Sequence, residues 1–246
     1  MLYIFTDEYG SPTYKNLHKD PNKAFFLSAI VIEPKEYPLV DREIKAFKFR
    51  WFNTQKVFLR FRLISNRESI CSFLSDKALE KRFHDDLYET LKRCKFRTLG
   101  VYISKEKMQQ QYSYPVHPYL SSIQLICERL IWNDEKDFRW CFESRGTRED
   151  KVYEEGLRRQ ERYGYIDPAL PMYLSNELKK LNISAVFRTK KHFVSGLDIA
   201  DTAAYCMGSI IRKWELGVSD FWPFSERIAR LLFGRIFHER AIVILP

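Results

Sequence analysis

Four carboxylates in this sequence lie where an α/β protein can use them for chemistry. Asp7 follows the apolar run LYIFT, Glu143 follows WCF, and a glycine comes three residues after each acid. Because strand ends in such sheets carry ligand-binding and catalytic groups, both acids are candidates for a site. Each also has an ordinary explanation. Asp7 can stabilise a turn, and Glu143 can pair on the surface with Arg145 or Arg148.

The other two carboxylates lie in GLDIADTAAY, residues 196–205. Asp198 and Asp201 are three positions apart, so on a helix they share one face. Ser195 and Asp198 also have the spacing of a helix-start capping box, which accounts for Asp198 without a ligand but leaves Asp201 unexplained. The small residues around them predict close packing against a sheet, where a charged face needs a compensating partner.

A hard divalent cation is the partner that such a set of acidic oxygens favours. Together, Asp7, Glu143, Asp198 and Asp201 would suit Mg²⁺ or Mn²⁺. Two such ions about 4 Å apart can activate a water and stabilise the leaving oxygen when a phosphodiester bond is hydrolysed. In this hypothesis Asp7, Glu143 and Asp201 are catalytic and bind metal, and Asp198 assists as a further ligand.

The charge of the chain favours a polyanion as partner, since 41 Lys and Arg against 32 Asp and Glu give a formal net charge of +9. Nucleic acid, DNA or RNA, is the leading candidate. Residues 45–62 interleave basic and aromatic side chains, as surfaces for single strands do, although an element with its aromatic side chains inward gives the same pattern. A second basic run, RTKKHF, precedes the acidic helix, and a solvated charge run is its default explanation. The candidate phosphate contacts are Lys45, Lys48, Arg50, Arg145, Lys190 and Lys191.

The elements that must position these side chains follow from the apolar periodicity. Extended patterns occupy residues 2–6, 23–33, 57–63, 96–104, 138–144, 183–190 and 241–245. Helical patterns occupy residues 36–52, 76–94, 117–132, 149–164, 225–239 and the stretch around 196–205. This order predicts an α/β fold with a mixed sheet flanked by helices. No linker divides the chain, so we expect a single domain over 1–246 with a helical extension at its C-terminal end.

Several other classes of protein are not indicated. The five cysteines are odd in number and lack any C-x-x-C spacing, so neither a disulfide framework nor a zinc site is expected. The first apolar run stops at Asp7 and no run of ~18 apolar residues occurs, so we expect a soluble, cytoplasmic protein without a membrane partner. A glycosidase has only the paired carboxylates in its favour.

Two motifs, YIFTDEYG and GLDIADTAAY, resemble the ribonuclease H-like family called domain of unknown function 3800. Members of that family typically open with a strand ending D-E-S-G and later carry L-Q-x-A-D-L-x-A-Y on a helix. The resemblance implies a ribonuclease H-like fold, nuclease activity, and a site in which Asp7 is the first-strand acid, Asp201 the acid of the late helix and Glu143 the middle acid. Glu8 and Gly10 also match the opening motif.

Three positions depart from the family pattern. Tyr9 replaces the usual serine, Asp198 replaces the usual glutamine, and the histidine-containing element of the family is not evident in RFRLISNRE, residues 60–68. Two hypotheses follow. The first is a nuclease that depends on Mg²⁺ or Mn²⁺, and the second is a catalytically inactive nucleic-acid-binding protein on the same fold.

Overall fold

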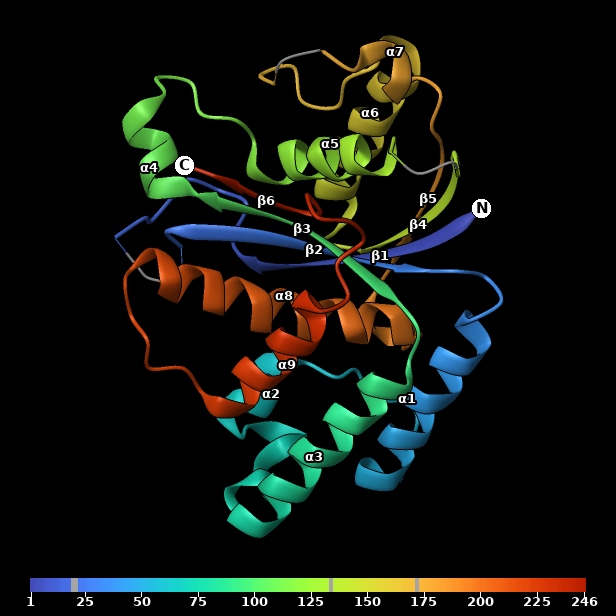
Figure 1. Cartoon of the computed structure of the whole chain (residues 1–246), viewed down its shortest axis with the longest axis vertical. Helices are drawn as coiled ribbons and strands as arrows, with labels where there is room; N and C mark the ends of the chain where they lie inside the picture. The colour runs from blue at the N-terminus through green and yellow to red at the C-terminus, as the bar shows by residue number, and fades with distance from the viewer. Residues whose placement is uncertain (19–21, 133–134, 171–172) are drawn as a thin grey trace.

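The computed structural model describes residues 1–18, 22–132, 135–170 and 173–246, which form an α/β structure around a six-stranded mixed sheet (Figure 1). The strands are β1 (Leu2–Gly10), β2 (Ala24–Ile32), β3 (Arg97–Ser104), β4 (Asp137–Glu143), β5 (Asn182–Arg188) and β6 (Ile242–Leu245). Their order across the sheet is β5-β4-β1-β2-β3-β6. The expected α/β class with a mixed sheet and flanking helices is confirmed.

The strand directions bring distant acids to one edge of the sheet. β1, β2 and β3 form an antiparallel meander, whereas β4 runs parallel to β1 and β5 runs parallel to β4. The last paired residues of β1 and β4 are Thr6 and Phe142, so Asp7 and Glu143 follow side by side. Asp7 is not at a strand end as expected, because β1 continues to Gly10 through its pairing with β2.

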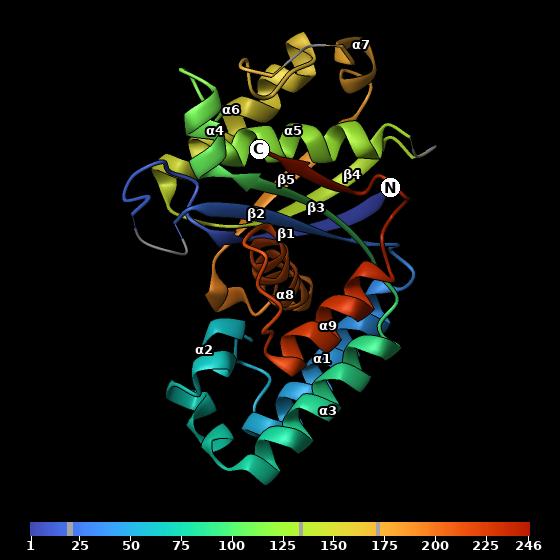
Figure 2. The same cartoon turned by 60° about the vertical axis from the view of Figure 1, so that its left-hand side comes forward.

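Helices cover both faces of the sheet (Figures 1 and 2). One face carries α1 (Tyr37–Phe52), α2 (Phe61–Asn66), α3 (Lys77–Arg93), α8 (Ser195–Glu215) and α9 (Pro223–Phe233), and the other carries α4 (Lys105–Gln111), α5 (Pro118–Leu130), α6 (Thr147–Tyr163) and α7 (Ser175–Leu178). Short 3-10 segments span Ser69–Ser75 and Lys190–His192. Because side chains alternate along a strand, the fully buried β2 contributes Phe26 to one core and Phe25 to the other. No helix of the described ranges combines the length and apolar composition needed to cross a bilayer.

The strand expected at residues 57–63 is wrong over its whole length. Residues 57–60 have no strand partner, and α2 begins at Phe61. The backbone N–H groups of Leu59 and Phe61 donate to side chains of α8 rather than to a neighbouring strand. The short helices α2, α4 and α7 carry no apolar repeat long enough to predict them. The helix expected over 225–239 ends at Phe233, after which the chain returns to the sheet as β6.

Small residues let α8 approach β1 closely, and Figure 2 shows α8 nearly end-on beneath that strand. A Cβ atom at Gly196 would lie 2.4 Å from Cγ of Phe5, and one at Gly208 would lie 2.9 Å from Cβ of Tyr9. Between them, the Ser28 hydroxyl of β2 donates to the carbonyl of Ala200 at 2.8 Å. The height and rotation of α8 over the sheet, and with them the position of Asp201, are therefore set by contacts that tolerate no larger side chain.

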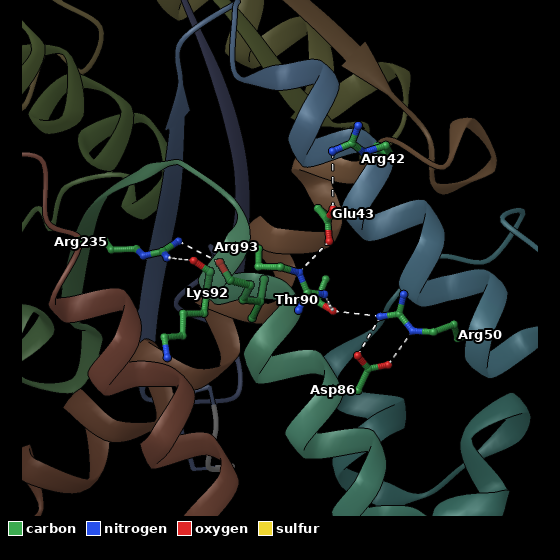
Figure 3. A network of polar contacts seen from close by, with 9 residues as sticks. Arg42, Glu43, Arg50, Asp86, Thr90, Lys92, Arg93 and Arg235 are labelled. Atoms are coloured by element: carbon green, nitrogen blue, oxygen red, sulfur yellow. Dashed lines mark hydrogen bonds and ion pairs between the residues drawn. The ribbon is translucent and has the colours of Figure 1, made fainter.

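A polar network joins α1 to α3 (Figure 3). Arg50 makes two hydrogen bonds to the carboxylate of Asp86, at 3.0 and 2.8 Å, and Glu43 accepts from Nε of Arg93 at 2.8 Å. The indole N–H of Trp51 donates to the same Asp86 carboxylate at 2.7 Å. Arg50, expected to contact nucleic acid, is thus engaged in linking two helices.

We predict that Gly196→Ala destabilises the protein, although alanine is the better helix former by about 1 kcal/mol. The added methyl group meets the Phe5 ring at 2.4–2.5 Å, and overpacking of this kind costs about 1–3 kcal/mol. Urea denaturation measures the change. Gly234→Ala is the matched control, because φ is −69° there and the nearest atoms are 3.4 Å from a Cβ. Equal stability of wild type and Gly196→Ala would contradict the close packing.

Candidate active site

A cleft of about 970 Å³ opens over the C-terminal ends of β1 and β4 and the side of α8. Three of the four carboxylates singled out in the sequence, Asp7, Glu143 and Asp201, line it together. They come from two neighbouring parallel strands and from the helix packed against one of them. The other charged side chains of its wall are Glu8, Arg60, Arg62, Glu68, Arg145 and Lys190.

Asp7 is the most deeply placed of the three acids and is 5% exposed. Its Oδ1 accepts the backbone N–H of Glu8 at 2.8 Å, but its buried Oδ2 has no hydrogen-bond partner among the described residues. Burial raises the pKa of this carboxyl well above its usual range, and the nearby charges of Asp201 and Glu143 raise it further. Its Oδ2 therefore needs either a proton or a cation.

Asp201 and Glu143 stand on either side of Asp7 with partners of their own. Oδ2 of Asp201 accepts the backbone N–H of Phe61 at 2.7 Å, and burial raises the pKa of Asp201 to about 6 against the opposing effect of that N–H. Oε1 of Glu143 pairs with Nζ of Lys190 at 2.9 Å. The same ammonium group also opposes the upward pKa shifts of Asp7 and Asp201. Lys190 thus serves as the counter-ion of all three acids.

The donor set fits a hard divalent cation such as Mg²⁺ or Mn²⁺, since every candidate ligand is a carboxylate oxygen and the buried Oδ2 of Asp7 receives no hydrogen bond from a described residue. Within the described ranges, however, no group of three or more His, Cys, Asp or Glu side chains is already arranged to hold an ion. Cation binding would thus require small movements of the carboxylates and the withdrawal of Lys190 from Glu143.

Asp198 is fully buried and lies outside the lining of the cleft. Its Oδ2 contacts Nζ of the equally buried Lys48 at 2.5 Å, and its Oδ1 accepts the N–H of Leu59 at 2.8 Å. Burial raises the pKa of Asp198 to about 6, while Lys48 opposes the shift. Both of its oxygens are therefore engaged inside the protein, and the expected role as an additional metal ligand has no geometric support.

The capping explanation for Asp198 is also wrong. The N-cap of α8 is Val194, without a side-chain cap, and the hydroxyl of Ser195 donates to Asp41 of α1 at 2.7 Å. Asp198 instead fixes two other segments to α8. It holds α1 through the ion pair with Lys48, and it holds the backbone at Leu59 through a hydrogen bond.

The candidate phosphate contacts divide into two groups. Arg145 and Lys190 line the cleft, where they pair with Glu8 and Glu143. Lys48 is excluded from any surface by its burial, and Arg50 links α1 to α3. The remaining two lie outside the cleft lining, Lys45 paired with Asp41 at 2.5 Å and Lys191 exposed to solvent.

Two further cations line the cleft, Arg60 and Arg62. Both belong to the segment 45–62, but neither was singled out from the sequence as a candidate phosphate contact. Leu59 and Phe61 are buried and the arginines between and after them are exposed toward the cleft. Neither arginine forms an ion pair with a described residue. The alternation in LRFR is the signal that could have found them, but it cannot say which face borders a site.

We predict that Asp7→Asn makes the metal-free protein more stable, and increasingly so as pH rises. A carboxyl with a raised pKa in the folded state contributes stability at low pH that is lost as pH rises through that pKa. The amide removes this loss and can donate to a neighbouring carboxylate. Thermal melts of both proteins in EDTA between pH 5 and 8 measure the difference in stability. Each kcal/mol of added stability raises the Tm by about 2–4 °C. Glu155→Gln, at an exposed position on α6, is the control. A difference in Tm between Asp7→Asn and wild type that does not grow with pH would contradict the prediction.

Comparison of the chain with models of protein families, with curated proteins and with solved structures finds no match in any of the three. The geometry and chemistry of the cleft are therefore the basis on which a function is assigned.

Proposed function

We propose that this protein is a nuclease that hydrolyses phosphodiester bonds in DNA or RNA with the help of Mg²⁺ or Mn²⁺. The observation that carries the proposal is the convergence of Asp7, Glu143 and Asp201 in a cleft with cationic walls, around the buried Oδ2 of Asp7, which receives no hydrogen bond from an N–H or O–H group of the described residues. A hard cation satisfies that oxygen, and arginine and lysine side chains are suited to the phosphates of the substrate.

The sheet supports the ribonuclease H-like part of the proposal. Three antiparallel strands followed by parallel strands that helices connect is the element order of that fold, and β1 to β5 follow it. β6 extends the sheet beyond β3. In the proposed assignment to the family called domain of unknown function 3800, Asp7 and Asp201 occupy the positions of the acids in its two motifs.

The residues of the chain have distinct tasks in this proposal. Asp7, Glu143 and Asp201 hold the metal, which when bound activates a water and stabilises the leaving oxygen. Asp7 is buried and the other two acids are partly buried, which lowers the local dielectric and strengthens charge interactions at the reacting phosphate. Arg60 and Arg62, without ion-pair partners among the described residues, hold substrate phosphates at the outer wall of the cleft.

Asp198 acts on the site as a positioning residue. Together with Asp201 it anchors the backbone of residues 59 and 61, so that the side chain of Arg60 between them is directed to the cleft. The buried Lys48 balances its charge and ties α1 to the same point.

The second candidate is an inactive nucleic-acid-binding protein, and one observation favours it. Lys190 pairs with Glu143 and neutralises the acidic cluster, and the acids of the described ranges do not already form a ligand cage. In this alternative Lys190 occupies the place of the metal permanently.

Cleavage assays separate the two functions. Labelled single- and double-stranded DNA and RNA are incubated with wild type and with Asp201→Asn under Mg²⁺, Mn²⁺ or EDTA. We expect cleavage by wild type that EDTA abolishes and that Asp201→Asn lowers by about 10²-fold or more, because one metal ligand is lost. Glu155→Gln should cleave like wild type. Binding without cleavage by every protein and metal would favour the inactive alternative.

The role of Lys190 has a separate test. We predict that Lys190→Gln binds Mn²⁺ about 1.4-fold to fivefold more tightly than wild type, because the competing ammonium is gone and partly exposed ion pairs contribute about 0.2–1 kcal/mol. Isothermal titration of Mn²⁺ into both proteins measures it without any substrate. Lys191→Gln, which changes the exposed neighbour, should leave the affinity unchanged. Weaker Mn²⁺ binding by Lys190→Gln would show that Lys190 does not compete for the site.

A further inference from the structure

A second pocket, of about 300 Å³, lies beside the first turn of α8 on the same face of the sheet. Its wall is aromatic. Tyr37 of α1 stacks on Phe5 with ring centroids 5.4 Å apart, and Tyr3 meets Tyr37 edge-on at 5.6 Å. Cys141 of β4 and Val186 of β5, which are paired in the sheet, form an apolar floor.

Two arginines stand at the rim of this apolar slot. Arg139 of β4 and Arg188 of β5 line it, and neither forms an ion pair with a described residue. Both guanidinium groups act on the Cys141 thiol, where they oppose the rise in its pKa that burial causes. Arg139 lies two residues before Cys141 on β4 and Arg188 two residues after Val186 on β5, so both arginines are on the same face of the sheet as the floor of the pocket.

This combination selects the chemistry of a ligand. An aromatic wall above an apolar floor accepts a flat ring, and unpaired guanidinium groups at the rim accept an anion attached to that ring. A ligand of this kind is a nucleotide, with the base in the slot and its phosphates at the arginines of the rim.

The second pocket adjoins the cleft. Cys141 and Glu143 are two residues apart on β4 and share one face, which places their Cα atoms about 7 Å apart. On the neighbouring strand, Arg188 pairs with Glu143 in the sheet register, and Lys190 of the cleft follows two residues later. A chain of nucleotides whose phosphate lies at the acids can thus reach the second pocket along β4 and β5.

We propose that this pocket is a subsite for one unpaired nucleobase next to the scissile phosphate, and that the substrate is single-stranded nucleic acid. A base in a duplex is stacked and paired and cannot enter the slot without leaving its helix. The inference rests on the proposed nuclease function, whose site it extends.

Binding in the absence of cleavage tests the subsite. The probes are a fluorescently labelled oligothymidylate, the same strand with abasic sites, and a blunt duplex, all titrated in EDTA. Wild type should bind the intact strand about tenfold more tightly than the abasic strand or the duplex. Tyr3→Leu, which keeps apolar volume but removes the ring, should lower the affinity for the intact strand about tenfold and leave that for the abasic strand unchanged. Arg139→Gln, at an exposed side chain, should weaken binding of both strands.

Each outcome is informative. Arg158→Gln is the charge-matched control and should bind like wild type. Arg158 is exposed on α6, which covers the face of the sheet opposite to the two pockets. Metal-dependent cleavage by proteins whose binding is unaffected by Tyr3→Leu and Arg139→Gln would overturn the subsite and leave the nuclease proposal standing. Absence of both binding and cleavage with every probe would overturn both proposals.

Discussion

The close packing of α8 on β1 is the contact on which the candidate site depends. With glycine at 196 and 208 facing Phe5 and Tyr9, the helix can lie in only one register over the strand. That register places Asp201 beside Asp7, and β4 adds Glu143 because it runs parallel to β1. A site built in this way rests on rigid elements, which is what positioning of reacting groups requires.

The cost of gathering acids in a buried place is met by cations from other parts of the chain. Lys48 of α1 compensates Asp198 inside the protein, and Lys190, from the turn after β5, compensates the acids of the cleft. The two pairs differ in consequence. The Lys48 pair is sealed from solvent and holds structure, whereas the Lys190 pair is partly exposed, so the ammonium group can leave when another cation arrives.

In the proposed function, the cleft and the aromatic pocket bind successive parts of one nucleic-acid strand along β4 and β5. Acids from β1, β4 and α8 line the cleft, arginines without an ion-pair partner among the described residues stand on both sides of them, and an aromatic slot lies about one nucleotide away. The β4–β5 half of the sheet, beside the first turn of α8, thereby gains a binding role of its own.

The sequence by itself determined most strands and long helices, because local periodicity carries that information. It also singled out Asp7, Glu143 and Asp201, the three acids that line the cleft, by their residue type and position. Only the tertiary structure decided between the roles of Asp198 and Asp201, which share a helix face but meet different neighbours. It also buried Lys48, and it turned residues 57–60 away from any strand by bonding Leu59 and Phe61 to α8. Such outcomes depend on partners more than a hundred residues away, and no local pattern encodes which partner will arrive.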